Sequence, residues 1–162
     1  MDKHFTIILL LFIIVLLSPD MCLLIEKFET KNALEKTRTQ QLNANNQLLQ
    51  ICSNSPKTGF YRDGYCNIGE YDKGTHTVCA KMTKEFLDFT KKQGNDLSTP
   101  NKTNDFPGLK PGDNWCLCAL RWAEAHNHDK NLVPKIKMDA TNIKTLYYIE
   151  KEILDENKLT EN

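Results

Sequence analysis

Net charge of either sign is missing from this sequence of 162 residues, in which Lys and Arg total 21 and Asp and Glu also total 21. Without an excess of positive charge, no long-range field draws a polyanion toward the molecule. A basic stripe interleaved with aromatic side chains, which single-stranded nucleic acid needs, is absent as well. We therefore expect no nucleic-acid partner.

Recognisable catalytic motifs are also missing. The sequence contains no phosphate-cradling glycine loop, no GxSxG nucleophile elbow, no HExxH zinc motif and no calcium-binding loop. It shows no internal repeat, which excludes solenoids and propellers. The strand–helix alternation of a parallel sheet is absent too, so a doubly wound sheet is not expected.

One long hydrophobic run is present, FTIILLLFIIVLL, from Phe5 to Leu17. At about 1.5 Å per helical residue it covers about 20 Å of a hydrocarbon core about 30 Å thick, so it reaches the length of a span only by extension to residue 25. No small-x-small cleavage site follows the run. We expect residues 1–25 to form an uncleaved single-pass anchor in a membrane. The alternative is a cleaved signal peptide and a secreted domain.

The rest of the chain divides by composition. Residues 26–47 are polar and predict a linker, residues 48–155 predict one domain, and residues 156–162 predict a tail. The expected fold class is α+β, a small two-layer sandwich with long irregular loops, preceded by the N-terminal apolar helix. Basic residues after the run place the domain on the cytoplasmic side, whereas a signal peptide places it outside.

Two long loops are predicted in the domain, at residues 52–74 and 95–112, because turn-forming residues crowd both segments. Between them Thr83 is placed to cap a helix that Gly94 ends. Asp113 is placed to cap a second helix that runs directly into WCLCALRWAEAH.

The C-terminal third predicts one strand and one helix. Apolar and polar residues alternate from Val133 to Ala140, which is typical of a half-buried strand. Thr141 or Asn142 then begins a last helical stretch.

Several sequence motifs resemble those of an uncharacterised, mainly bacterial family of small domains of unknown function. They are TGFYRDG, GTHTVCA, GNDLSTP and FPGLKPGDNWCLCALRW, and they begin at residues 58, 74, 94 and 106. The resemblance covers about residues 48–153 and implies a compact two-layer α+β fold without any catalytic assignment. Members of that family lack the N-terminal run, and many carry two adjacent cysteines where this chain has Tyr65-Cys66.

The cysteine and histidine residues are the most specific candidates for a chemical site. Zinc prefers thiolate and imidazole ligands in tetrahedral sets, so one hypothesis is a zinc site. Its ligands would be Cys66, His76, Cys79 and Cys116. The spacing of Cys116 and Cys118 departs from the usual two-residue gap, which weakens this hypothesis. A second interpretation is that the cysteines are small core residues, paired as disulfides in an oxidising compartment.

A reactive thiol is the third interpretation. If Asp113 caps the second helix, Cys116 lies in its first turn, where the helix dipole favours the thiolate. His76 would then serve as the catalytic base.

Polar residues of the two long loops predict a ligand-binding cleft. The candidates are Arg62, Asp63, Asp96, Lys110 and Asp113. Arg62 suits an anion such as a carboxylate or phosphate, although a structural Arg–Asp pair explains it equally well. The preferred hypothesis is a membrane-anchored binding or accessory module with an unidentified small-molecule or protein partner. The alternative is an enzyme that uses Cys116 with His76, or the zinc site.

Overall fold

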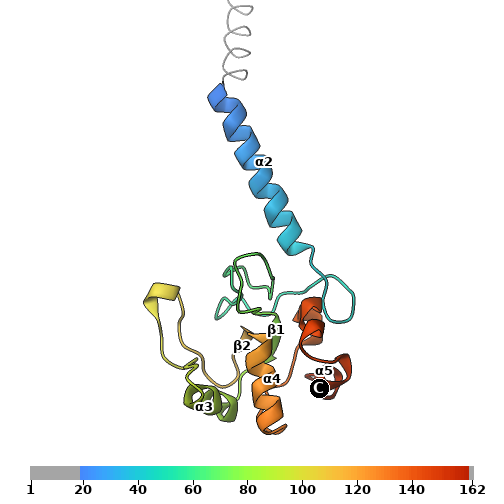
Figure 1. The fold of residues 1–162 in the computed structure, drawn as a ribbon. Helices are drawn as coiled ribbons and strands as arrows, with labels where there is room; N and C mark the ends of the chain where they lie inside the picture. Colours follow the sequence, from blue (N-terminus) through green and yellow to red (C-terminus); the bar gives the residue numbers. More distant parts are fainter. Residues whose placement is uncertain (1–18, 161–162) are drawn as a thin grey trace, which may run out of the picture. The chain divides into compact units, whose positions relative to one another are not determined.

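The structure is a computed structural model that describes residues 19–160, and it divides into two units at residue 37. The described part of the first unit belongs to helix α2, Pro19–Thr39 (Figure 1). Leu23, Leu24 and Phe28 on this helix are exposed. Within residues 19–160 no helix combines the length and apolarity that a membrane crossing needs. The predicted apolar helix of residues 5–17 lies outside the described residues.

The second unit is small and α+β, as the sequence predicts. Strands β1 (Val78–Lys81) and β2 (Asn114–Leu117) form an antiparallel pair in which Cys79 lies opposite Cys116. The remaining elements are three α-helices and three short 3-10 helices, and α3 contacts α4 (Figure 1). They are α3 (Lys84–Lys92), η1 (Lys102–Asn104), α4 (Ala119–His128), η2 (Met138–Ala140), η3 (Ile143–Tyr147) and α5 (Lys151–Glu156).

Helix α3 begins and ends where the sequence predicts. The Thr83 side chain accepts a hydrogen bond from the backbone N–H of Phe86, which satisfies one of the unpaired donors of the first turn. Phe86, Leu87 and Phe89 are buried, so the apolar side of the helix faces the core. Both long loops are confirmed as irregular segments, with only η1 inside the second.

The helix predicted directly after Asp113 is wrong in its first five residues. Residues 114–117 form β2, and α4 begins only at Ala119. Trp115, Cys116 and Leu117 are buried opposite β1, and this long-range pairing overrides the helical spacing of the local sequence. Cys116 therefore lies on a strand and gains no helix dipole.

The strand predicted at residues 133–140 is reduced to a single pairing residue. Ile136 bridges Ala80 of β1 and Lys158, and the chain then turns into η2. The alternating burial is real, since Ile136, Met138 and Ala140 are buried while Lys135 and Asp139 are exposed. The Asn142 side chain accepts a hydrogen bond from the backbone N–H of Lys144 and so caps the next segment, as predicted. That segment is the 3-10 helix η3.

Residues just before the predicted domain start also enter the core. Ala44 is 3% exposed, and its backbone N–H donates to the carbonyl of Thr141. Asn43, 1% exposed, donates its side-chain amide to the carbonyl of Asp139 at 3.1 Å. The end of the polar segment 26–47 is thus tied to the C-terminal third of the chain.

Candidate functional site

A pocket of about 1140 Å³ opens between the two long loops, and we call it the interloop pocket. Its floor is β2 and the start of α4, which carry Trp115 to Cys118 and Arg121. The two loops form its walls. The other lining residues are Gly59, Phe60, Arg62, Gly74, His76, Asn95, Asp96, Leu97, Thr99, Pro100, Asn101, Lys102, Asn104 and Phe106.

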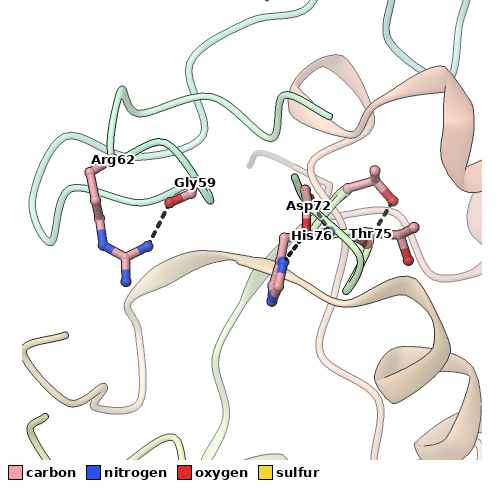
Figure 2. Close-up of polar contacts among 6 residues, drawn as sticks. Gly59, Arg62, Asp72, Thr75 and His76 are labelled. Carbon is pink, nitrogen blue, oxygen red and sulfur yellow. Dashed lines mark hydrogen bonds and ion pairs between the residues drawn. The ribbon is translucent and has the colours of Figure 1, made fainter. Parts of the chain in front are cut away.

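A buried carboxylate orients His76 in this pocket. Nδ1 of His76 lies 2.6 Å from Oδ1 of Asp72, whose side chain is fully buried, while the His76 side chain is 37% exposed (Figure 2). The other carboxylate oxygen accepts the backbone N–H of His76 at 2.9 Å. Because a carboxylate only accepts, Nδ1 carries the proton and Nε2 keeps its lone pair when the ring is neutral.

The His76 ring is also fixed by its neighbours. It stacks on Phe60 with ring centroids 5.9 Å apart. The ring also packs close to Gly74, where an added Cβ would lie 2.5 Å from Cε1 of His76. A side chain at residue 74 would therefore displace the imidazole, which explains why a glycine occupies this position.

Arg62 joins the two loops. Its guanidinium donates to the carbonyl of Gly59 at 2.6 Å (Figure 2). It also donates to the carbonyl of Asn104 at 3.1 Å, and Nε donates to the carbonyl of Asp105 at 3.3 Å. The same group lies over the ring of Trp115, 5.1 Å from its centroid. Within residues 19–160 Arg62 forms no ion pair with an aspartate carboxylate, and its side chain bonds backbone oxygens instead.

Strained backbone surrounds the pocket. Residues 19–160 contain four non-glycine residues with positive φ, and three of them flank the pocket: Arg62 (53°), Thr75 (50°) and Asp105 (46°). Thr75 is β-branched, so the left-handed region is especially unfavourable for it. Its carbonyl accepts the N–H of Ala119 at 3.1 Å, which fixes the start of α4 to the residue before His76.

Asp96 organises the wall formed by the second loop. Its carboxylate pairs with Lys91 at 2.9 Å and accepts from the backbone of Ser98 and from both the backbone and hydroxyl of Thr99. The Lys91 contact, followed by the hydrogen bonds from Thr99 and Ser98, holds the pKa of Asp96 well below its ordinary value. Asp96 therefore stays ionised and shapes the loop.

Three of the predicted ligand-binding residues do not line the interloop pocket. Asp63 accepts from Tyr65 N–H and the Asn67 side chain, and Asp113 accepts from Lys110 N–H at 2.8 Å. These carboxylates stabilise turns. The pocket thus brings together Arg62, Asp96 and His76 of the predicted residues and leaves out Asp63, Lys110 and Asp113.

The predicted metal ligands divide between two places. Cys66 and Cys116 form one disulfide, and Cys79 forms another with Cys52, a residue that is not among the predicted ligands. All four cysteines are at most 3% exposed. His76 is not part of the sulfur cluster and bonds Asp72 instead. Disulfide-bonded Cys116 has no thiol to ionise, so the nucleophile predicted at this position is wrong for the oxidised chain.

Cys118 is a second cysteine of the pocket lining, and the sequence predicts no role for it. It is half-buried, carries a free thiol and lines the pocket with His76. It also occupies the N-cap position of α4 without a side-chain capping bond. The other free cysteine of the described chain is the exposed Cys22 on α2. Correct placement of α4 from the sequence would have put Cys118 rather than Cys116 at the helix start.

Comparison with known proteins gives a family and no activity. No curated protein matches the chain. A family described as "uncharacterized protein conserved in bacteria (DUF2237)" matches residues 42–158, well over half of the sequence, which confirms the resemblance found in the sequence. The chain belongs to this uncharacterised family of proteins conserved in bacteria.

Proposed function

We propose that the domain is a binding module that takes a small anionic molecule in the interloop pocket. The observation that carries this proposal is the backbone strain at Arg62, Thr75 and Asp105, which flank the pocket. Such conformations each cost about 1–3 kcal/mol and cluster at ligand sites, where the surrounding structure maintains them. A purely structural loop has no need of three of them around one opening.

The charges of the lining residues favour an anion. Arg62, Lys102 and Arg121 contribute positive charge, whereas Asp96 is the one acidic lining residue and is already paired with Lys91. Lys102 makes no ion pair within residues 19–160. Arg121 is paired with Glu124 at 2.8 Å. An anion entering the pocket would therefore meet Arg62 and Lys102 as the cations without a carboxylate partner within residues 19–160.

The remaining donors and the apolar side chains of the lining favour an anion with an apolar body. Three of the five N–H groups of Arg62 are used by backbone carbonyls, which leaves two for a carboxylate or phosphate oxygen. Phe60, Phe106 and Trp115 supply apolar surface beside them. A few polar anchors on an apolar lining are typical of small-molecule sites.

Binding of benzoate and of inorganic phosphate, followed by amide chemical shifts of the full chain, tests this proposal. We expect both anions to shift Gly59, His76 and Leu97, and neutral benzamide to leave them unchanged. Arg62→Met should weaken benzoate binding about tenfold or more, because it removes charge-assisted hydrogen bonds. Equal binding of benzamide and benzoate would contradict the proposal.

Two further variants separate charge from loop structure. Lys102→Met removes a pocket charge without touching the contacts that Arg62 makes, so it should also weaken benzoate binding. Lys130→Met removes an exposed charge outside the pocket and serves as the matched control. If Lys102→Met and Lys130→Met weaken binding equally, the lining charges do not select the ligand.

A second candidate function is thiol chemistry by Cys118. The specific observation is the contact between His76 and Asp72, which leaves Nε2 as an oriented base in the pocket that Cys118 lines. In this arrangement Cys118 is the nucleophile, His76 takes its proton, and Asp72 is a positioning residue. Cys118, two residues after Cys116, thus takes the role of nucleophile that the sequence predicts for Cys116.

Alkylation of the native, oxidised chain by iodoacetamide tests this second candidate. We expect Cys118 to react faster than Cys22 at neutral pH, and His76→Gln to slow Cys118 roughly tenfold or more while leaving Cys22 unchanged. Asp72→Asn should also slow it, because the amide can donate to Nδ1 and move the ring proton to Nε2. An unchanged rate for Cys118 in His76→Gln would rule out the base.

Two separate observations support proposals about the surroundings of the domain. The run from Phe5 to Leu17 supports a membrane anchor. The two disulfides favour an oxidising compartment for the folded domain, in conflict with the cytoplasmic side that the basic residues after the run predict. The two-layer arrangement of the fold and the absence of a nucleic-acid partner stay predictions.

A further inference from the structure

Four cysteines from three parts of the sequence converge in the interior. Cys79 and Cys116 face each other across β1 and β2, while Cys52 and Cys66 come from the first long loop. The exposed fractions of the four residues are 3%, 0%, 0% and 1% in sequence order. They form a small buried cluster of their own with Ala140.

The sulfur atoms of the two disulfides lie against each other. Sγ atoms of Cys52, Cys66 and Cys116 are all within 4.8 Å of one another, and Cys79 is bonded to Cys52. A zinc ion with four thiolates at about 2.3 Å separates its sulfurs by about 3.8 Å. Three of the four sulfurs are therefore already gathered to about the spacing that one tetrahedral ion requires, and the fourth, Sγ of Cys79, is bonded to one of them.

We propose that the reduced chain binds one zinc ion through Cys52, Cys66, Cys79 and Cys116, and that disulfide formation releases it. Four thiolates and no water complete a tetrahedral set, which is the form of a structural zinc site. The ligand set differs from the one predicted from sequence, since Cys52 takes the place of His76.

The two states exchange by a balanced four-electron reaction. The zinc tetrathiolate reacts with two molecules of a small disulfide and four protons. The products are Cys52–Cys79, Cys66–Cys116, a free Zn²⁺ ion and four molecules of the small thiol. Each protein disulfide forms by thiol–disulfide exchange, in which two protein thiolates lose two electrons and one small disulfide gains them.

Zinc binding gives the reduced chain the same cross-links as the oxidised one. Both states join β1, β2 and the first long loop at one point, because the same four residues supply the ligands and the disulfides. Free energy of zinc binding becomes free energy of folding when the ligands are disordered in the unfolded chain. The domain can therefore fold before it is oxidised.

Zinc content and thiol protection of the full chain test this inference. The chain is reduced with a phosphine, loaded with Zn²⁺ and desalted. We expect one zinc per chain and slow alkylation of the four cluster cysteines. Glutathione disulfide should then release the zinc and leave the pairs 52–79 and 66–116 in a peptide map. A reduced chain that retains no zinc would overturn the proposal.

Matched variants assign the ligands. Cys118→Ser should still bind one zinc, because Cys118 lies outside the sulfur cluster. Cys52→Ser should lose stoichiometric zinc, and its retention would overturn the ligand set. If Cys52→Ser fails to fold, Co²⁺ bound to the wild-type reduced chain gives the answer independently. Its thiolate charge-transfer absorption should match four sulfurs in tetrahedral geometry, and an intensity for two or fewer would overturn the site.

Discussion

Replacing both Cys66 and Cys116 with alanine is expected to lower the free energy of unfolding by about 4 kcal/mol. The disulfide joins residues 50 positions apart, and closing a loop of that length removes about this much chain entropy from the unfolded state. Single domains are stable by about 5–15 kcal/mol, so the loss approaches the whole stability of the domain. Urea unfolding followed by tryptophan fluorescence in the presence of EDTA measures it.

Alanine is chosen because the sulfur positions are buried and a serine hydroxyl would add an unpaired polar group. EDTA excludes any stabilisation by zinc should the Cys52–Cys79 disulfide be reduced. The matched control is Cys118→Ala, which removes a half-buried free thiol and should change the free energy by less than about 1 kcal/mol. A double variant no less stable than this control would show that the Cys66–Cys116 bond does not constrain the folded domain.

The elements that sequence reasoning located correctly are those specified by neighbouring residues. Thr83 caps α3 through its own hydroxyl and a backbone donor three residues later, so the whole signal lies within one turn. The irregular loops follow equally from local turn chemistry. By contrast, β2 exists because Cys116 pairs with Cys79, 37 positions earlier (116 − 79), and no local pattern records that pairing.

The site was predictable to the same extent. Arg62, Asp96 and His76 were named because their residue types stood out in glycine-rich loops, and all three line the interloop pocket. Asp72 lies four residues before His76 in a turn, where a carboxylate is ordinary, and only folding shows that it is buried against the imidazole. The partners of Cys66 and Cys79 were equally inaccessible, because disulfide connectivity does not follow from cysteine spacing.

Trp122→Ala is expected to destabilise the domain by about 3–5 kcal/mol, the cost of emptying a large core site. The side chain is 0% exposed, and its ring stacks on His126 with centroids 5.4 Å apart. Its Nε1–H donates to the carbonyl of Pro134 at 3.1 Å, which ties α4 to the segment where Ile136 pairs with β1. Urea unfolding read by the fluorescence of Trp115, the remaining tryptophan, measures the loss.

Trp122→Phe separates the packing of this side chain from its hydrogen bond. Phenylalanine keeps most of the apolar volume but leaves the Pro134 carbonyl without its donor, so we expect a smaller loss of about 1–3 kcal/mol. Because Cys118 and Arg121 reach the pocket from the first turn of α4, loosening this helix should also weaken benzoate binding, in the order wild type, Trp122→Phe, Trp122→Ala. If phenylalanine costs as much as alanine, the hydrogen bond to Pro134, rather than the packed ring, positions α4 and the floor of the pocket.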